Sequence, residues 1–447
     1  MPYFPPLLAY QPKAREHAAM YNCSGTHWPG HIAPYGFDAS LAGVPWASMS
    51  LNSNGVLSAL NLIAHWEYTR DRAFLADVAF PFCRDALAFY QCWMERSADG
   101  TSWQITRDQA HECNPGAPVT EAGKQLHCYQ NNSAVANGFV RRVARALPSM
   151  AAALGEPVDP EWAEIAEGLA PLPTDPRPGQ DVFVLAGERT DVACAVPKKG
   201  EKGAGQLCGI RQPGHMHGGP HFSACTACVA QPSGSMAVGT WHIFPGESTS
   251  LASPEALRTT SINTLENDAG WSQGNSFCCI YSQAARVGMP LPRWLPQWHK
   301  LIQQTSLPNF IPYQGGGGVE VAGALQAVAD LMLQSVTQPD TSGQTMMILF
   351  PLGINHTDIT FHRLRGKGGF IVSASWSKDS MRLSGAVSLH SEKGEPCRIM
   401  LPPTQTGAVR VEELSGGGGR KQVAATRQGQ LVAFNTSVAT DYVLTAQ

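Results

Sequence analysis

The stretch that decides the fold runs from residue 55 to residue 94 and reads GVLSALNLIAHWEYTRDRAFLADVAFPFCRDALAFYQCWM. Four apolar residues in its first half recur at the spacing of one face of an amphipathic helix: Val56, Leu60, Ile63 and Trp66. Asp71 then gives a helix start signal, and Pro81 can open a further helix because proline is tolerated in the first helical turn. The pattern predicts two long helices joined by a short turn.

The same unit recurs further along the chain. Residues 134–155 have a helical pattern, and Asp159-Pro160-Glu161 and Ser253-Pro254-Glu255 each combine a polar residue, a proline and an acid as a helix begins. Three more helical stretches are predicted at residues 271–287, 293–304 and 321–335. Repeated helical hairpins are typical of a toroid or solenoid, so we expect a mainly α domain over residues 41–353.

The two ends of the chain lack the helical residue pattern. Residues 1–40 are interrupted by proline and glycine, and we expect an irregular lead-in there. After Pro351 the sequence favours β-branched and alternating residues, as in Phe370–Trp376. We therefore predict a smaller, β-sandwich-like domain over residues 354–447, with a packing role and no chemistry of its own.

Composition excludes several classes of function. The 447 residues are 43% hydrophobic and 15% charged, as in a globular protein. The net charge of −3 and the lack of a basic run argue against a nucleic-acid partner, and no apolar run is long enough to span a membrane. No cofactor motif is found. The first twenty residues lack a secretory apolar region, so secretion is expected only for a chain that begins further upstream, and oligomeric state is not indicated.

The segment Pro45–Asn54, PWASMSLNSN, precedes the first long helix and contains a pair of asparagines, Asn52 and Asn54. Such a pair commonly caps a helix or forms a turn. In an extended segment, side chains two residues apart also point the same way, so their carbonyl oxygens could accept hydrogen bonds from one water molecule or one sugar hydroxyl. Both interpretations stay open from the residues alone.

A second polar segment, Trp103–Pro115, reads WQITRDQAHECNP and lies between two predicted hairpins. A carboxyl group beside tryptophan and proline in a partly closed cleft can acquire a raised pKa and act as a general acid. Glu112 is our candidate, and Asp108 is the next carboxylate to test. The alternative is a solvated loop glutamate.

Five segments, in order, resemble glycoside hydrolase family 95, the α-L-fucosidase family. They are Pro45–Asn54, the loop with Glu112, Ala327–Ser335 (AVADLMLQS), Ile348–Pro351 (ILFP) and Leu364–Phe370 (LRGKGGF). The third is similar to a Glu-Met-Leu-Leu-Gln-Ser helix of the family, and the last two are similar to its barrel exit and to the start of its C-terminal β domain. Together they cover most of residues 40–400.

The resemblance implies an α/α six-hairpin toroid and an inverting hydrolase that removes a terminal α-L-fucosyl or related α-L-galactosyl residue from a glycan. It implies that Glu112 is the general acid and that Asn52 and Asn54 hold the attacking water. An amide is too weak a base alone, and the family supplies an aspartate from the loop before its Leu-Gln-Ser helix. Here that loop, residues 314–321, contains no aspartate, and Glu320 is the replacement at hand. Alternatively, Glu320 is only an acidic residue in the first turn of its helix, where the helix dipole favours a negative charge.

The same resemblance suggests substrate contacts. The stretch Gly239–Pro245 occupies the place of a His-rich, substrate-contacting segment of the family, and His242 remains in it. Trp46 and Trp103 could stack on the apolar face of a sugar, and His111 beside Glu112 is a further candidate. A packed core position is the common alternative for each. The family's N-terminal β-sandwich is not recognised ahead of Pro45, so a truncated catalytic core is expected.

Residues 181–235 form an insertion with scattered Cys and His residues and one Cys225-Thr226-Ala227-Cys228 pair. A zinc site would need a second ligand pair at regular spacing, so we expect a disulfide or free thiols and no metal. Two alternatives to the hydrolase stay open. One is a non-catalytic carbohydrate-binding homologue, which would release no sugar. The other is a metal-binding interaction protein using the Cys/His loop, which would contain stoichiometric zinc.

Overall fold

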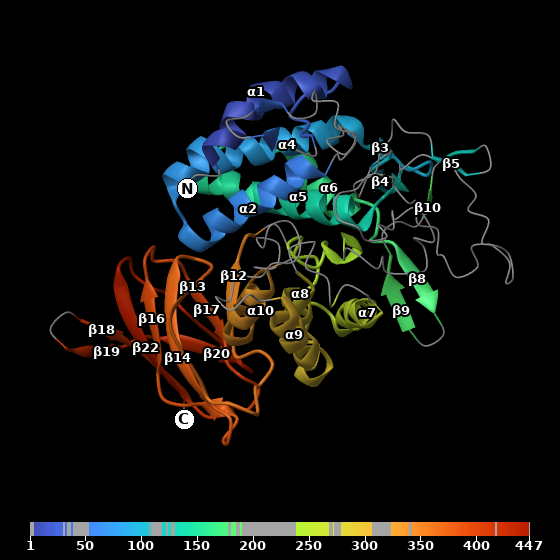
Figure 1. Ribbon diagram of the computed structural model, residues 1–447. Helices are drawn as coiled ribbons and strands as arrows, with labels where there is room; N and C mark the ends of the chain where they lie inside the picture. Colours follow the sequence, from blue (N-terminus) through green and yellow to red (C-terminus); the bar gives the residue numbers. More distant parts are fainter. Residues whose placement is uncertain are drawn as a thin grey trace, which may run out of the picture.

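The structure is a computed structural model that describes residues 4–29, 32–33, 37–38, 53–106, 108, 119–121, 124–126, 130–177, 180–184, 188–189, 238–267, 271, 279–305, 323–338, 342–415 and 418–446. Helices fill the part of the chain coloured blue to yellow in Figure 1, and the strands coloured orange to red gather at one end of them. No described helix is long and apolar enough to cross a membrane.

The first group of helices builds one apolar core. Its members are α1 (Phe4–Met20), α2 (Asn54–Thr69), α3 (Arg72–Phe74), the π-helix η3 (Leu75–Ala79), α4 (Phe80–Trp93), α5 (Ala134–Leu154) and α6 (Pro160–Gly168). The Asp71 side chain accepts hydrogen bonds from the backbone amides of Ala73 and Phe74, which confirms the predicted start signal. Helix α2 packs against α4 and α5, and α5 also packs against α6.

The second group follows the insertion. It consists of the 3₁₀ turn η5 (Val238–Thr240), α7 (Glu255–Glu266), α8 (Cys279–Val287), α9 (Leu291–Thr305) and α10 (Gly323–Met332). Helix α8 packs against α7, α9 and α10. Ile243, Tyr281 and Trp294 are buried in the cluster that these elements share.

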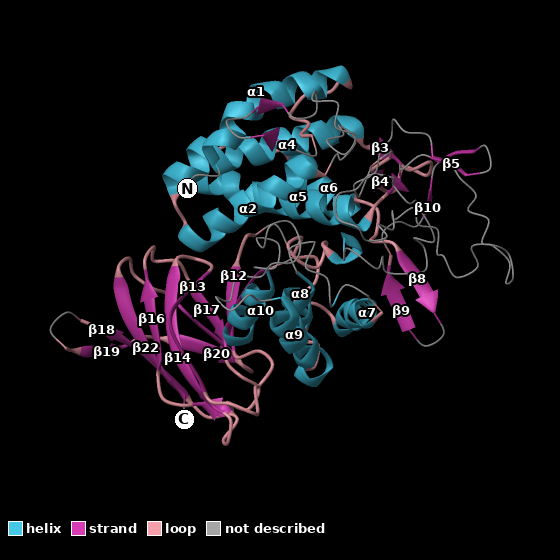
Figure 2. Ribbon diagram, viewed as in Figure 1, coloured by secondary structure: helices cyan, strands magenta, loops and turns pink. Residues whose placement is uncertain are grey.

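Short two-stranded sheets decorate the helices. They pair β1 (Ile32–Ala33) with β2 (Phe37–Asp38), β3 (Glu95–Arg96) with β4 (Trp103–Gln104), β5 (Val119–Glu121) with β6 (Lys124–Leu126), β7 (Gln130–Asn131) with β10 (Glu188–Arg189), and β8 (Thr174–Arg177) with β9 (Gln180–Phe183). Figure 2 shows that strands β3, β4, β5, β8, β9 and β10 lie at the far end of the helices from the large C-terminal sheets. The helical region therefore has two distinct ends.

The C-terminal region forms two sheets. Its strands are β11 (Leu333–Thr337), β12 (Thr345–Leu349), β13 (Ile359–Gly366), β14 (Phe370–Ser377), β15 (Arg382–Leu383), β16 (Val387–Ser391), β17 (Cys397–Met400), β18 (Val409–Leu414), β19 (Arg420–Gln422), β20 (Ala425–Gln428), β21 (Leu431–Phe434) and β22 (Thr440–Ala446). One sheet has the order β11-β12-β17-β21-β20, and the other has β13-β14-β16-β22-β18-β19 with β15 added on β14. One buried apolar cluster contains residues of both sheets, among them Leu349, Trp376 and Tyr442. A helical region followed by a β domain is confirmed.

The expected irregular lead-in is wrong for residues 4–20, which form α1. The prolines at positions 5 and 6 fall in the first turn, where the missing amide hydrogens have no helical partner anyway. Four residues at helical spacing point into the core: Leu7, Tyr10, Ala14 and Ala18. The prolines concealed a helical period that tertiary packing stabilises.

The predicted helix over residues 321–335 also ends early. Helix α10 stops at Met332, and Leu333-Gln334-Ser335 continues as strand β11 beside β12. Strand β11 has five residues, and its first four are buried. A short buried apolar run fits a strand as well as a helix, so the sequence pattern alone could not show where the helix ends. The β structure therefore begins at residue 333, before the boundary expected at residue 354.

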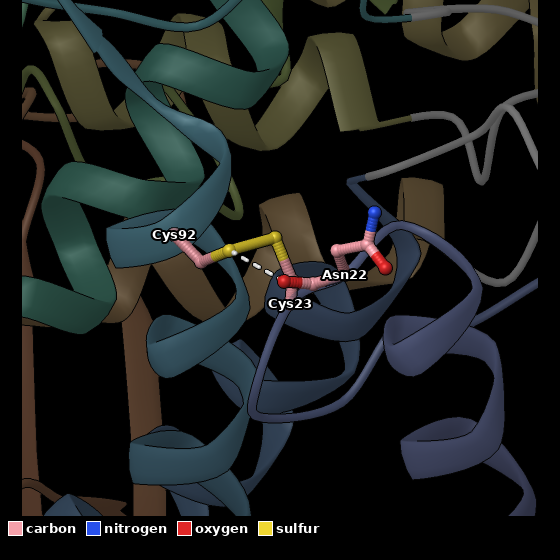
Figure 3. Close-up of a disulfide and its surroundings, with 3 residues drawn as sticks. All are labelled: Asn22, Cys23 and Cys92. Carbon is pink, nitrogen blue, oxygen red and sulfur yellow. Dashed lines mark hydrogen bonds between the residues drawn. A yellow bond between two sulfur atoms is a disulfide. The ribbon is translucent and has the colours of Figure 1, made fainter.

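A disulfide joins Cys23, just after α1, to Cys92 in the last turn of α4. Figure 3 shows the bond beside the backbone of Asn22, whose carbonyl oxygen lies 3.7 Å from the Cys92 sulfur. The two cysteines are 69 residues apart in sequence, so the bond closes a long loop. It fastens the first helix to the hairpin that decides the fold.

We expect Cys92→Ser to lower the free energy of unfolding by about 2–4 kcal/mol, because the open chain gains conformational freedom when unfolded. Denaturant unfolding of the oxidised protein and of the variant measures the difference. Addition of a reductant should bring the wild-type curve onto that of the variant. Identical wild-type midpoints with and without reductant would contradict this stabilising role.

Candidate functional site

The candidate residues divide into two groups. Asn54, Trp103 and His242 lie in the described part of the chain. The other candidates lie outside the described residues: Trp46, Asn52, His111, Glu112 and Glu320. For this second group, only the described residues next to each segment are considered.

Asn54 is the first residue of α2, immediately after the Asn52 segment. Its amide nitrogen Nδ2 donates a hydrogen bond to the carbonyl oxygen of Pro29 at 3.1 Å, which orients the amide. The next residue is Gly55, where a Cβ atom would lie only 2.6 Å from Cδ1 of the buried Trp28 ring. The start of α2 is thus held against the Trp28–Pro29 segment, and the water-holding role of Asn54 stays a prediction.

Asp108 is fully buried at the start of α5. Its Oδ2 atom accepts a hydrogen bond of 2.7 Å from the hydroxyl of Ser133, and the Ser133 oxygen in turn accepts from the amide of Ala136. A carboxylate beside a helix N-terminus is favoured by the helix dipole. Asp108 itself is therefore held against the first turn of α5.

Tyr90 of α4 lies beside this carboxylate. Burial, and to a smaller extent the charge of Asp108, raises the pKa of Tyr90 well above its usual value. The phenol consequently stays protonated at any ordinary pH. It can contribute only a neutral hydroxyl next to Asp108.

His242 is also fully buried, two residues after η5. Its Nδ1 atom lies 2.7 Å from the Ser248 hydroxyl, and Phe183 meets the ring edge to face. Gly138 of α5 leaves no room for a side chain, since a Cβ there would lie 2.5 Å from the Cβ of His242. Burial, assisted by the charge of Arg141, lowers the pKa of His242 to about 3. The imidazole is therefore neutral, and its contact with substrate stays a prediction.

Trp103 of β4 is half-buried. The guanidinium of Arg96 lies 3.8 Å from the centre of its ring, and its backbone oxygen accepts a hydrogen bond from Ala170. One ring face is thus engaged by Arg96, so a sugar would have to stack on the other. That role also stays a prediction.

The loops that carry the catalytic candidates lead into helix N-termini. Asn52 stands two residues before α2, and Glu320 stands three residues before α10. The segment with Glu112 begins at Asp108, which is bonded to the cap residue of α5. Figure 1 shows the N-terminal end of α5 beside β4 and its C-terminal end toward the β domain. The described residues next to these loops thus lie at the N-terminal ends of helices, and the positions of Asn52, Glu112 and Glu320 stay predictions.

A cluster of buried and half-buried charges lies near the C-terminal ends of α2, α8 and α10 and beside the middle of α5. We call it the charge cluster, and it consists of Glu67, Arg142, Glu247, Arg286, Asp330 and Lys367. Arg142 lies 2.5 Å from Glu67 and 3.1 Å from Glu247, and Arg286 lies 3.0 Å from Asp330. Three cations face three carboxylates, so the charges balance. Glu67 follows Asn54 by thirteen residues, which is about 20 Å along α2.

Lys367, in the turn between β13 and β14, joins the β domain to this cluster. Its Nζ atom lies 2.7 and 2.8 Å from the carboxylate oxygens of Glu247, 2.9 Å from Glu67 and 3.0 Å from the Thr337 hydroxyl. Its backbone amide donates to the Ser335 hydroxyl. Residues 364–370 and 327–335, two of the segments that resemble the family, are therefore in contact where the β domain meets the helices.

Sequence reasoning missed the charge cluster, although a signal was present. Glu67, Arg286 and Asp330 fall at positions on the apolar faces of α2, α8 and α10, where an unpaired charge would be very costly. Such charges require partners, and the pairing could not be assigned without the tertiary arrangement.

We expect acid to weaken the fold through Glu67. Burial disfavours the charge of Glu67, but Arg142 and Lys367 outweigh burial and lower its pKa from 4.5 to about 2. A depressed pKa gives stability that is complete above pH 4.5 and is lost as the pH falls toward 2. Burial raises the pKa of Asp330, which acts in the opposite sense. Denaturant unfolding between pH 7 and 3 should therefore show a smaller pH slope in Glu67→Gln, and equal slopes would refute the assignment.

A family model that describes the catalytic domain of glycosyl hydrolase family 95 matches residues 2–179. The matched range contains Asn52, Asn54, Asp108 and Glu112, and the resemblance to family 95 is confirmed. No curated protein matches the chain.

Two solved structures are similar over different lengths. A putative kojibiose phosphorylase from human microbiome is 9% identical, with a TM-score of 0.49 over 96% of this chain and 56% of its own. The catalytic domain of GH30 xylanase C from Talaromyces cellulolyticus is 13% identical, with a TM-score of 0.14 over 17% of this chain and 18% of its own. The chain thus spans at most 56% of either structure.

Proposed function

We propose that the protein is an inverting glycoside hydrolase that removes a terminal α-L-fucosyl or α-L-galactosyl residue from an oligosaccharide or glycan. The observation that carries the proposal is the family 95 catalytic-domain match over residues 2–179, which includes Asn52, Asn54 and Glu112. These residues have the side chains that inversion requires, namely an acid for the leaving oxygen and acceptors for a water molecule.

We propose further that the helices form an α/α toroid of six hairpins. The packing of α2 on both α4 and α5, of α5 on α6, and of α8 on both α9 and α10 supports this arrangement. The charge cluster supports it as well, because it joins residues in α2, α5, α8 and α10. In such a toroid the loops at the N-terminal ends of these helices would surround one pocket.

In this pocket Glu112 would protonate the leaving oxygen. Asn52 and Asn54 would hold the water by accepting its hydrogen bonds, and Glu320 would take the proton from it. An inverting pair of carboxyl groups stands about 6.5–9.5 Å apart to admit that water. Trp46, Trp103, His111 and His242 would contact the sugar, and no cofactor takes part.

The test is the anomeric configuration of the released sugar. Hydrolysis of an aryl α-L-fucoside, followed by proton NMR from the first turnover, should show the β-anomer before mutarotation. An aryl α-L-galactoside, which differs by one hydroxyl group, measures the preference between the two sugars. Release of the α-anomer first would contradict inversion. Absence of any free sugar from both substrates would favour the non-catalytic carbohydrate-binding alternative.

A further inference from the structure

A cleft lies beside the C-terminal ends of α2 and α5, between these helices and the C-terminal β domain. We call it the interdomain cleft. Its volume is 830 Å³, within the range of pockets that bind small ligands. Helix α2 contributes Trp66, helix α5 contributes Ser149, and strand β17 contributes Arg398. Trp66 follows Asn54 by twelve residues, so about 18 Å of helix separates this cleft from Asn54.

The interdomain cleft is positively charged. Its lining contains Arg70, Arg72, Lys393 and Arg398, and Glu395 is the acid that lines it with them. The whole chain has a net charge of −3, so this concentration of cations stands against the overall balance. A concave surface lined by one sign of charge attracts ligands of the opposite sign.

Several buried donors in the cleft lack acceptors among the described residues. They are the Nε atoms of Arg70 and Arg398 and the indole Nε1 of Trp66. Trp66 is 6% exposed, and the guanidinium of Arg70 lies 5.0 Å from the centre of its ring. The carboxylate of Glu395 is 3.9 Å from Arg70 Nε, which is too long for a hydrogen bond. Buried donors normally have partners, and an oxygen atom of a ligand bound in the cleft would supply them.

Structural roles account for only some of these cations. Arg72 donates to the carbonyl oxygen of Leu154 at 3.5 Å and so serves the C-terminal end of α5. The side chain of Lys393 lies over Gly369, where a Cβ would be 2.8 Å from it. Arg398, by contrast, projects from strand β17 and has a buried Nε with no acceptor among the described residues. It is the residue on which an anion site depends most.

We propose that the interdomain cleft binds an acidic saccharide, whose carboxylate or sulfate contacts Arg398 and Arg70. Gln344, Thr426 and Asn435 supply polar groups for the sugar hydroxyls along the same cleft. The choice of a saccharide rests on the proposed glycosidase function, whereas the need for an anion rests on the cleft alone. The site would hold an acidic part of the glycan away from the catalytic loops.

Isothermal titration calorimetry tests this with trigalacturonic acid as the acidic probe and maltotriose as a neutral trisaccharide. Protein from a bacterial host keeps Asn435, which lies in an Asn-Thr-Ser sequon, free of glycan. We expect trigalacturonic acid to bind, with weaker binding at higher salt, and maltotriose not to bind. Arg398→Gln should weaken binding tenfold or more, because a charged hydrogen bond is lost.

Arg363→Gln is the matched control, because Arg363 is an exposed arginine of β13 that does not line the cleft. It should bind trigalacturonic acid like the wild type. Both variants should hydrolyse a small aryl α-L-fucoside at the wild-type rate, which separates this site from catalysis. Unchanged affinity in Arg398→Gln, or equal binding of inorganic sulfate alone, would overturn the proposal. If Arg398→Gln lost both hydrolysis and binding of trigalacturonic acid, the probe would be binding in the catalytic pocket. That result would also overturn the proposal.

Discussion

Replacement of Glu112 by glutamine should lower kcat for an aryl α-L-fucoside with a poor leaving group by about 10²–10⁴-fold, the usual contribution of a general acid. Glutamine keeps the size of the side chain but cannot deliver a proton to the leaving oxygen. Steady-state kinetics at the pH optimum of the wild type measure the loss. Because binding of the sugar does not need this proton, KM should change much less than kcat.

The leaving group separates a general acid from a residue that only supports the fold. A dinitrophenyl leaving group departs without protonation, so Glu112→Gln should hydrolyse the dinitrophenyl fucoside at nearly the wild-type rate. Glu95→Gln, at an exposed glutamate of β3, is the matched control and should keep full activity on both substrates. Equal losses on both substrates in Glu112→Gln would show that Glu112 is not the acid.

Asp108→Asn is the informative comparison at the second carboxylate of the same segment. Asp108 is fully buried and accepts a hydrogen bond from the cap residue Ser133. Its replacement should therefore weaken the anchoring of the segment and reduce activity on good and poor leaving groups alike. A selective loss on the poor leaving group would transfer the role of acid to Asp108.

Helices were predicted best where apolar spacing and a start signal agreed. Asp71 and Asp159 each accept hydrogen bonds from the first backbone amides of a helix. Ser253 does not begin α7, which starts at Glu255 after Pro254. Local signals thus located the helices to within a few residues, because backbone capping is itself a local interaction.

Features that depend on distant partners were not predictable. The prolines of α1 hid a helix whose Gln11 and Arg15 side chains bind Asp85 of α4 and whose residue Tyr10 packs on Trp28. Strand β11 follows α10 without a break because β12 is available to pair with it. The disulfide between Cys23 and Cys92 joins two of twelve cysteines, and no spacing rule selects that pair. Among the site residues, Asn54 was predicted beside its helix, while the burial of His242 depends on Gly138 and Phe183, far away in sequence.

Lys367→Met should destabilise the protein by about 3–5 kcal/mol, the cost of breaking a buried ion pair. Lys367 is 1% exposed, and its removal leaves Glu67, Glu247 and Asp330 with only Arg142 and Arg286 as cations in the charge cluster. Methionine retains the apolar stem, so the loss measures the charge rather than the packing. Lys378→Met, on an exposed hairpin of the β domain, is the matched control and should change stability by less than about 0.5 kcal/mol.

A second substitution, Glu67→Gln, tests whether Lys367 stabilises the protein through its ion pair with Glu67. Glu67→Gln in the Lys367→Met background leaves two cations facing two carboxylates, so the double variant should be more stable than Lys367→Met alone. The two single variants and the double variant, each measured by denaturant unfolding, form the required cycle. Because Lys367 lies in the β domain and Glu67 at the end of α2, a positive coupling would mean that this ion pair joins the β domain to the helical region in the folded protein. Equal stability of Lys367→Met and Lys378→Met would instead mean that the charge cluster contributes nothing to joining them.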